Sequence, residues 1–475
     1  MPSAGSAADG DFATFGAISS HFRLFHHLFL PPPLGADTFA AQTQMQAKME
    51  QILEIPARMR IDNAANIYPA SLSKHYASLY RMSVTLTEPV DIAVLQQALV
   101  TVSGRIPTFR CELRAGAFWW HLRRMDKEPE VGPAAPLNRF HFSDNGGFLY
   151  KVGADGNRIV LDVFHALADG TGSETFLLTL AAEYLRLRHG LDISYSGPVL
   201  DPSDAPDHGE VEDSFKTIFS GRKGSLEKSV PAYHIKGRRL PGSGLRDIRA
   251  VLPMDEVKQC CRRMNCTVTD LLAGMMLDAL QKIYRADGDG KKSSVLKVSV
   301  PVNLRPMYGS RSVRNFSSYV NLGFDVRSGF LPLEQIVRLV KMQKRTMLRP
   351  ENLEPKIAAN VQLEESIAVR CLPLAIKKPI IDLINRHHGD VYCSQTLSNL
   401  GEIRLPEEMR PYVTEFDFVL GGQRGNSGAV SCAGYDGKLF LHLSRNIFGA
   451  EFEQFFLDRA QSLGLLAGVS HHILA

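Results

Sequence analysis

The stretch RIVLDVFHALADGTGSETFLLTLAAEYL, residues 158–185, decides how the whole chain is interpreted. A run of residues that favour β-structure ends just before His165. Asp169 and Gly170 then predict a sharp turn, and an apolar-periodic segment begins soon after Ser173. A strand that is followed by a tight turn and a helix can hold a side chain rigidly at a cleft.

His165 has the chemistry to use such a position. Its ordinary pKa lies near neutral pH, so the ring can take up and return a proton. The carboxylate of Asp169 can brace the loop by pairing with a cation from elsewhere in the chain. The same residues also fit an ordinary turn that contains a hydrogen-bonded histidine. The stretch alone leaves both interpretations open.

The composition is that of a globular protein. The chain has 475 residues, 44% hydrophobic and 22% charged, which suggests two domains or one large two-lobed unit. Its 54 Lys and Arg residues against 50 Asp and Glu give a formal net charge of +4. So small an excess indicates neither nucleic acid nor a membrane as an obligatory partner.

The N-terminal residues match neither a membrane-spanning segment nor a signal peptide. The longest early apolar run, LFHHLFLPPPLG at residues 24–35, is too short to span a bilayer, so we expect no integral membrane segment. The first residues carry Asp9 and Asp11 in place of the basic region of a signal peptide. We therefore expect a cytoplasmic protein; a monomer is compatible with the sequence, which leaves the oligomeric state open.

Cysteine and histidine spacing indicates neither disulfides nor a metal site. The seven cysteines include no C-x-x-C pair, which fits reduced thiols. No acidic or thiol ligands accompany the three histidine pairs at metal spacing. The pairs are His26-His27, His387-His388 and His471-His472.

The chain divides into four parts by composition. Residues 1–55 are predicted to be a disordered tail or an over-extended start, with Met49 as an alternative first residue. Residues 56–194 form the first lobe, 195–245 a Pro- and Gly-rich connector, and 246–475 the second lobe.

Each half is predicted to begin with a strand and a helix and to continue with several strands. In the first half we expect strands at 79–86, 109–113, 118–122, 148–152 and 158–164, a helix at 91–106 capped by Asp91, and a helix after Ser173. The connector holds a short helix at 214–219. In the second half we expect strands at 247–253, 294–304 (buried), 317–326, 391–401, 413–421 and 428–444. Helices are expected at 255–264, 267–284 (capped by Thr267 or Thr269), 331–348 and 449–466. The stretch that follows residue 348, up to residue 386, is also expected to be helical. The predicted class is mixed α/β.

Several segments together resemble one family. The pattern H-x-x-x-D-G at residues 165–170 resembles the signature of the chloramphenicol acetyltransferase-like superfamily. VPVNLRPMYGSRSVRNFSSYVNLGF (300–324), SGRIPTFRCEL (103–113) and QTLSNLGEIRLP (395–406) resemble further segments of that family, and the resemblance covers residues 60–465. The block DNAANIYPASLSKHYASLYRMSVTL (62–86) is most similar to bacterial alcohol acetyltransferase-like proteins.

The chain also departs from the family pattern. Phe164 stands where many members have a first histidine, but the second histidine is the catalytic one in the family. EFDFVLGG (415–422) lacks the tryptophan of the D-F-G-W-G segment, so we expect Asp417 to be structural.

The resemblance implies a fold and a mechanism. It implies two lobes, each a sheet backed by helices (an α/β, two-layer α+β arrangement), with a tunnel between them. His165 would be the general base of an acyl-CoA-dependent O-acyltransferase, with no covalent enzyme intermediate. The donor would be acyl-CoA as co-substrate, with no bound cofactor, and the acceptor a small alcohol or amine.

The resemblance also assigns roles around His165. Asp169, followed by Gly170 in the turn, would pair with Arg305 and hold the loop. Ser398 or Asn399 would donate to the developing oxyanion; an ordinary strand-end turn explains these two residues equally well.

Other functions stay open at this point. A condensation-type enzyme would take its donor from a carrier protein, and a non-catalytic member would act as a binding protein. A membrane-associated wax ester or triacylglycerol synthase is disfavoured, because no stretch is amphipathic enough to lie on a membrane. The sequence leaves the acceptor and the acyl chain length undetermined.

Overall fold

The computed structural model describes residues 56–475, apart from 74–75, 138–141, 226–228, 288–292, 389 and 474–475. The segment Ile55–Ala475 clusters as a single unit by its internal contacts. The predicted tail at residues 1–55, with His26-His27, lies outside the described residues. The side chains of the other two histidine pairs are also outside the description.

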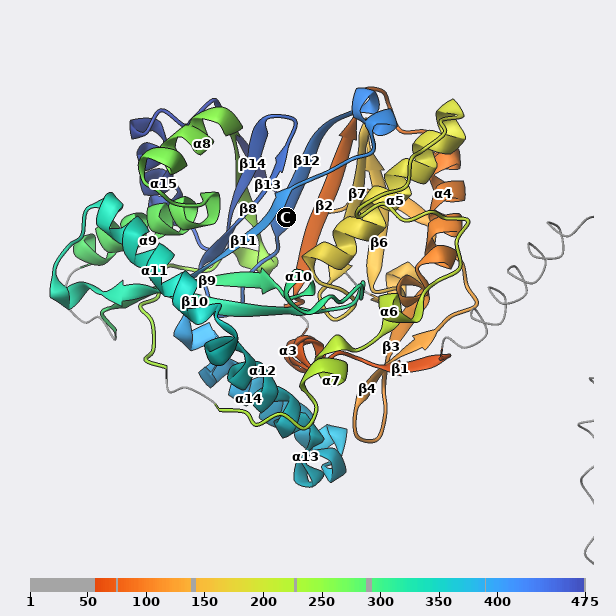
Figure 1. Ribbon diagram of the computed structural model, residues 1–475, viewed down its shortest axis with the longest axis horizontal. Helices are drawn as coiled ribbons and strands as arrows, with labels where there is room; N and C mark the ends of the chain where they lie inside the picture. Colours follow the sequence, from red (N-terminus) through yellow and green to blue (C-terminus); the bar gives the residue numbers. More distant parts are fainter. Residues whose placement is uncertain are drawn as a thin grey trace, which may run out of the picture. The chain divides into compact units, whose positions relative to one another are not determined.

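One sheet of five strands and two helices form what we call the N-terminal lobe. The strands lie in the order β12–β2–β7–β6–β5. Their bounds are β2 (Leu79–Leu86), β5 (Val131–Pro133), β6 (Tyr150–Asp155), β7 (Arg158–Phe164) and β12 (Val413–Leu420). Helices α4 (Ile92–Arg105) and α5 (Gly170–His189) pack against each other beside this sheet (Figure 1). The Asp91 carboxylate caps α4, as predicted.

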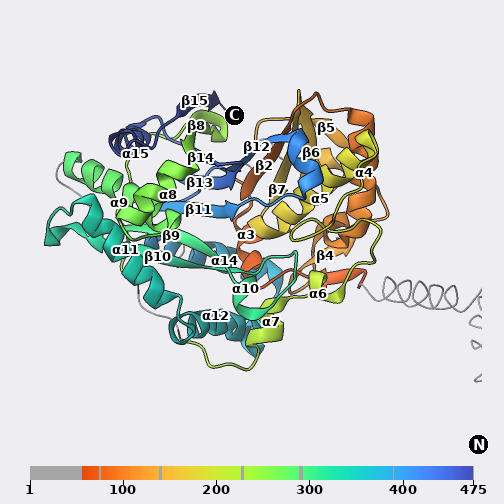
Figure 2. The same cartoon turned by 45° about the horizontal axis from the view of Figure 1, so that its top comes forward.

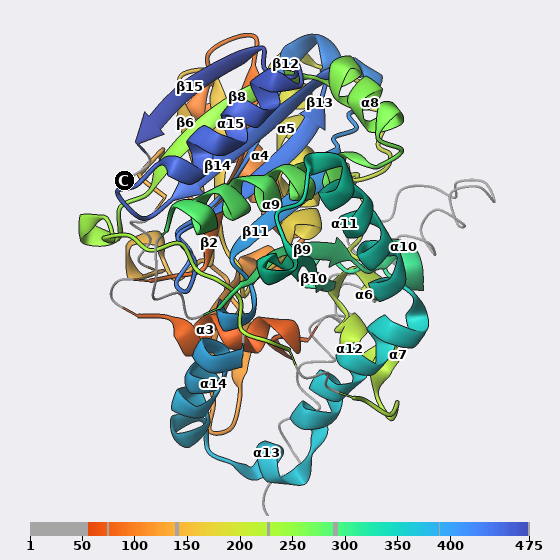
Figure 3. The same ribbon diagram turned by 90° about the vertical axis from the view of Figure 1, so that its left-hand side faces the viewer.

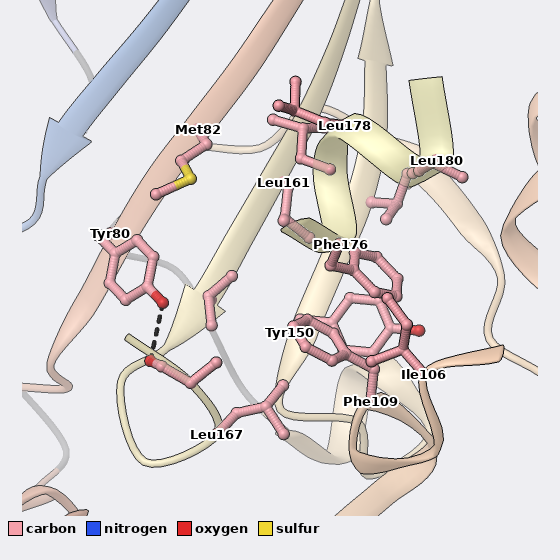
Figure 4. Close-up of a cluster of buried hydrophobic side chains, with 14 of the residues drawn as sticks. Tyr80, Met82, Ile106, Phe109, Tyr150, Leu161, Leu167, Phe176, Leu178 and Leu180 are labelled. Carbon is pink, nitrogen blue, oxygen red and sulfur yellow. Dashed lines mark hydrogen bonds between the residues drawn. The ribbon is translucent and has the colours of Figure 1, made fainter. Parts of the chain in front are cut away.

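Aromatic side chains fill the space between the first sheet and α5. The rings of Phe109 and Phe176 stack with centroids 4.0 Å apart, and Tyr150 meets Phe176 edge-on at 5.1 Å (Figure 4). Leu167, from the turn after β7, belongs to the same core. The turn that carries His165 is therefore packed against a dense hydrophobic core.

A second sheet, of seven strands, forms the C-terminal lobe. The strand order is β10–β9–β11–β13–β14–β8–β15. The strands are β8 (Arg246–Pro253), β9 (Val295–Asn303), β10 (Ser317–Asp325), β11 (Gln395–Glu402), β13 (Gly428–Tyr435), β14 (Lys438–Arg445) and β15 (Gly468–Ile473). The helices α8 (Met254–Arg263), α9 (Val268–Ala286), α11 (Leu333–Met347) and α15 (Glu451–Ser462) lie together on it (Figures 1 and 3). Thr267 caps α9.

A small third sheet and seven further α-helices of different lengths belong to the described part of the chain. The sheet has the order β1–β4–β3, with β1 (Arg58–Arg60), β3 (Cys111–Ala115) and β4 (Trp120–Arg124). The helices are α3 (Ile67–Ser71), α6 (His208–Val211), α7 (Ser214–Phe219), α10 (Arg305–Tyr308), α12 (Pro350–Glu365), α13 (Ile367–Cys371) and α14 (Leu374–His388).

Strand β12 shows that the predicted division at residue 246 does not separate the two sheets. It comes late in the sequence, yet it pairs with β2 of the N-terminal lobe, and Figure 2 shows the two strands side by side. Its other side meets β13 of the C-terminal lobe, where Ser431 Oγ donates to the carbonyl of Phe418 at 2.7 Å. A chain-order boundary therefore cannot describe the lobes, because the second half contributes a strand to the first.

The predicted mixed α/β, two-lobed class is confirmed. Three details differ from the prediction. Helix α5 begins at Gly170, a turn earlier than expected, because Asp169 serves as its N-cap. Strand β9 alternates between buried and more exposed residues, so it is not a fully buried strand. The short elements β1, α3, β5, α6 and α10 and the last strand β15 were not predicted.

Candidate active site around His165

His165 lies at the first position after β7, and main-chain hydrogen bonds fix it there. Its N–H donates to the carbonyl of Ser78 at 2.9 Å, which extends the pairing of β7 with β2 by one residue. Leu167 N–H then donates to the Phe164 carbonyl at 2.9 Å and closes the turn. The histidine backbone is thus held by the sheet, not by a free loop.

Two tyrosines enclose the imidazole. Tyr68 of α3 stacks on the His165 ring with centroids 4.3 Å apart, and Tyr80 of β2 meets it edge-on at 5.2 Å. The Tyr80 hydroxyl bonds the carbonyl of Ala168 at 2.8 Å and the hydroxyl of Ser173 at 2.7 Å. Figure 4 shows Tyr80 pointing into the turn. The ring therefore keeps one orientation between aromatic walls.

Asn315 determines which nitrogen of His165 carries the proton. The Asn315 Oδ1 and His165 Nδ1 lie 3.2 Å apart. The other side of Asn315 faces a carboxylate, since its backbone N–H and its Nδ2 approach Asp62 Oδ2 at 3.1 and 3.4 Å. A carboxylate accepts hydrogen bonds, so Nδ2 faces Asp62 and Oδ1 faces the imidazole. His165 Nδ1 then donates, and Nε2 carries the free lone pair.

Burial controls the protonation state of these groups. It lowers the pKa of His165 below its usual range, although a hydrogen bond to its own backbone, the Asp169 charge and the Asn315 hydrogen bond act in the opposite direction. The imidazole is therefore neutral at neutral pH, as a general base must be. Burial also raises the pKa of Asp62 to about 7, against the effect of Arg314, whose Nη2 lies 2.9 Å from its Oδ1.

Asp169 and Arg305 form a buried, bidentate ion pair. The guanidinium Nη1 and Nη2 donate to the two carboxylate oxygens at 2.9 and 3.0 Å. The same carboxylate accepts from the N–H groups of Gly172 at 3.0 Å and Phe316 at 2.8 Å. Arg305 Nε donates to the Ser312 carbonyl at 2.6 Å. With its oxygens in these contacts, Asp169 holds the loop and the start of α5.

The glycine that the fold needs here is Gly172, which lies two residues beyond the motif, and not Gly170. Gly170 has ordinary helical φ, and a Cβ there would meet only the flexible end of Leu400, at 2.8 Å. A Cβ on Gly172 would lie 1.9 Å from the backbone carbonyl oxygen of Val313. The sharp turn expected at Gly170 is therefore a helix start, and Gly172 allows the segment after α10 to pass.

The two predicted oxyanion donors, Ser398 and Asn399, lie next to each other on β11 and differ in their surroundings. Asn399 Nδ2 donates to Thr269 Oγ1 of α9 at 3.1 Å, and its Oδ1 accepts from Gly401 N–H at 2.8 Å. Both amide groups of Asn399 are thus engaged away from His165. Ser398 alternates with the buried Leu397 and shares a face with Leu400, which packs against the N-terminal core and Gly170. Ser398 therefore faces the histidine side of β11.

Tyr68, Tyr80, Asn315 and Asp62 were not predicted as site residues. Each lies in a segment that carries the family resemblance, either 62–86 or 300–324. Their residue types alone gave no signal, because tyrosine and asparagine are common in packed cores and turns. The signal would have been their shared position within those two segments.

Among the comparisons with known proteins, only the one with solved structures identifies the fold. The sequence matches no protein-family model and no curated protein. Among solved structures, it is similar to polyketide synthase associated protein 5 from Mycobacterium tuberculosis, with TM-score 0.56, 12% identity and coverage of 85% of this chain and 97% of that one. It is similar to F. sporotrichioides TRI101 complexed with coenzyme A and T-2, with TM-score 0.55, 10% identity and coverage of 88% and 100%. It is also similar to the condensation domain of the Monacolin K polyketide synthase MokA, with TM-score 0.52, 12% identity and coverage of 86% and 96%.

These similarities define the class of structure. The chain has the two-lobed fold of TRI101 and of the MokA condensation domain. At such low identity they establish the fold alone, and the predicted resemblance to alcohol acetyltransferase-like proteins stays a prediction. In the described part of the chain, every helix is too short or too polar to cross a bilayer.

Proposed function

We propose that the protein is an acyltransferase that moves an acyl group from acyl-CoA to a hydroxyl or amine acceptor, with His165 as the general base. One observation carries the proposal. A neutral imidazole is held at a strand end with Nδ1 directed at Asn315, 3.2 Å away, so that Nε2 is the available base. The fold that this chain shares with TRI101, whose structure contains coenzyme A, supports acyl-CoA as the donor.

The reaction follows from this geometry. Nε2 of His165 accepts the proton of the acceptor hydroxyl as that oxygen attacks the thioester carbonyl. The carbonyl oxygen becomes negatively charged, and the Ser398 hydroxyl is our candidate donor to it. The C–S bond then breaks, and His165 returns the proton to the leaving thiolate. Ester and free CoA result, with no acyl group attached to the enzyme.

Asp169 and Arg305 act on this reaction only through the loop. Their ion pair anchors the residues directly after His165, and it also fixes the segment that carries Asn315 through Phe316 N–H. One buried contact therefore fixes both the loop after His165 and the segment of Asn315. In this mechanism Asp169 and Arg305 are positioning residues.

Thiol release tests the proposal. Purified protein is mixed with acetyl-CoA or a longer acyl-CoA and a panel of alcohols and amines, and free thiol is followed. We expect acceptor-dependent release, which His165→Ala lowers by about 10²–10⁴-fold. The matched control is His208→Ala, which removes an exposed histidine on α6. Full activity in a folded His165→Ala variant would refute the mechanism.

The similarity to a condensation domain supports a second candidate, in which the donor is bound to a carrier protein. The same assay separates the two. Transfer from an acylated carrier protein, with no release from any free acyl-CoA, would favour the second candidate. Binding of acyl-CoA without any transfer would favour a non-catalytic member of this fold.

A further inference from the structure

Helix α14 exposes a stripe of apolar side chains. Ile376, Ile380, Leu383 and Ile384 are 52%, 43%, 56% and 48% exposed. Their spacing of three and four residues places them on one face of the helix. Large apolar side chains gathered in this way mark an interaction site more often than isolated ones do. We call these four residues the α14 stripe.

The opposite face of α14 fixes the stripe in its outward orientation. Leu374 is buried, and its N–H donates to the Ala117 carbonyl at 2.8 Å. Lys377 is buried too; its Nζ lies 3.3 Å from the ring centroid of Trp119 and donates to the Phe118 carbonyl at 2.8 Å. These contacts join α14 to the tip of the β3–β4 hairpin, and Figure 3 shows the two side by side.

A cation-lined hollow adjoins this junction. It has a volume of about 510 Å³ and is lined by Arg58, Arg60, Ala117, Phe118, Trp119 and His121. Phe118 is 45% exposed and sits at the tip that α14 contacts. Arg60 is partly neutralised by Glu364 at 2.8 Å, whereas Arg58 is exposed and its Nη2 lies 3.1 Å from Nδ1 of His121. The hollow thus offers positive charge beside an apolar surface.

We propose that the α14 stripe and this hollow form a docking surface for a membrane that contains anionic phospholipids. The stripe would enter the boundary between headgroups and acyl chains, and Arg58 with Arg60 would contact the phosphates. An apolar helix face flanked by cations is the pattern of helices that lie in a membrane interface. The exposed cations Lys378 and Arg370 add to this charge, while the nearby Asp382 is paired with Arg424 at 2.5 Å.

Charge complementarity favours lipid over a second copy of this chain. A self-interface would need an acidic partner for the arginines on the same surface, and Glu364 and Asp382 are already paired. The sequence predicts helix up to residue 386, but Pro379 and the two lysines interrupt the apolar spacing that would indicate an amphipathic segment. The proposal departs from the expectation that no segment is amphipathic enough to lie on a membrane.

The surface also lies near the active site. Helix α14 packs against α3, and Tyr68 of α3 stacks on His165. The helices α14 and α3 would therefore lie between a membrane bound at the stripe and the imidazole. The proposal does not depend on the proposed function, since docking can be measured without any turnover.

Vesicle flotation with the full chain tests the docking surface. Vesicles of phosphatidylcholine alone are compared with vesicles that also contain phosphatidylglycerol, at low and high salt. We expect binding to the anionic vesicles that weakens with salt. Ile380→Glu with Leu383→Glu should weaken binding at least about tenfold, since it removes inserted apolar surface. Arg58→Ser should reduce both binding and its salt dependence.

The matched control is Met342→Glu, which changes another exposed apolar residue, 61% exposed on α11. It should bind like the unaltered protein. Circular dichroism melting checks that each variant is folded; Leu383→Glu alone replaces the double variant if that one is not. Absence of binding to anionic vesicles, or equal binding by the stripe variants, would overturn the proposal. So would a dimer in sedimentation that the stripe variants dissociate.

Discussion

At the scale of single residues, the imidazole of His165 depends on side chains from distant segments. Tyr68 and Tyr80 set the plane of the ring, and Asn315 sets its tautomer. Asp62 holds Asn315 in turn, through two hydrogen-bond contacts to one oxygen. A change at Asn315 should therefore act on the reaction without touching a substrate.

We predict that Asn315→Ala lowers kcat by about tenfold or more, which is less than the loss of the base itself. The ring loses its orientation, while KM changes little. Protonation of His165 inactivates the base, so the acid limb of kcat/KM should lie below the ordinary histidine pKa of about 6.5. Because the Asn315 hydrogen bond favours the charged ring, its loss should shift this limb to still lower pH. The pH profile of thiol release measures both effects.

The control for Asn315 is Asn352→Ala, an exposed asparagine on α12. It should leave kcat and the acid limb unchanged. If Asn315→Ala behaves in the same way, the imidazole is not oriented by this contact, and the tautomer assigned above is incorrect.

Gly170 of the motif and Gly172 just beyond it give a second prediction for single residues. Gly172→Ala should destabilise the fold by about 3 kcal/mol or more, because the new methyl group collides with a backbone carbonyl that cannot move freely. Gly170→Ala should change the free energy of unfolding by less than about 1 kcal/mol, since Leu400 can rotate away and alanine favours a helix. Denaturant unfolding of both variants tests this prediction. Equal effects would show that the backbone at Val313 can move to accommodate the new methyl group.

At the scale of elements, a buried charge cluster joins the two sheets. His442 of β14 lies between two carboxylates, with Nδ1 2.6 Å from Asp247 and Nε2 2.9 Å from Asp417. Asp417 belongs to β12 of the N-terminal lobe, and Arg249 of β8 binds it at 2.7 Å. Both ring nitrogens face acceptors, so the ring is the charged, doubly protonated form. This places Asp417 in a structural cluster, as the missing tryptophan of its segment suggested.

The cluster predicts a pH dependence of stability. Burial favours neutral His442, but Asp247 and Asp417 raise its pKa to about 9. The folded value is above the unfolded one of about 6.5, so this contribution is fully present below about pH 6.5 and is lost as pH rises through about 9. We expect the free energy of unfolding to fall by about 3 kcal/mol across that window. In His442→Gln the slope should disappear; an unchanged slope in that variant would assign it to other groups.

The elements near the motif could be predicted because each has a strong local pattern. Strand β7 is a run of β-formers, and α4 has a cap at Asp91 followed by helical spacing. The position of β12 could not be predicted, because its alternating pattern fits either sheet and chain order favours the wrong one. The contact between Asn315 and His165 joins residues 150 positions apart, so no local pattern reports it. Gly172 was missed because its constraint lies in a segment that crosses from elsewhere.

At the scale of the whole described unit, the lobes are joined where the histidine loop meets the segment after β9. Asp169 follows β7 of the N-terminal lobe, and Arg305 follows β9 of the C-terminal lobe. Their side chains are only 5% and 10% exposed, so their charges interact with little screening by water. The same contact therefore belongs both to the cohesion of the lobes and to the geometry of the active site.

A double-mutant cycle on this pair tests both roles. Asp169→Asn alone leaves the Arg305 charge buried without its partner, and Arg305→Met alone does the same to Asp169. Each single change should cost roughly 3–5 kcal/mol, because a buried charge is left uncompensated. The double variant should cost less than the sum of the two, since neither charge is then stranded. Unfolding by denaturant and thiol release are both measured. The control is the exposed Arg311→Met, whose partner is Asp207; it should change neither measurement.

Strict additivity in both measurements would show that Asp169 and Arg305 are not energetically coupled. Coupling in stability without coupling in thiol release would leave the ion pair to hold the lobes together, with no influence on the imidazole. We expect coupling in both, because the backbone that carries Asp169 also carries His165 four residues earlier, and Phe316 N–H ties the Asn315 segment to the same carboxylate.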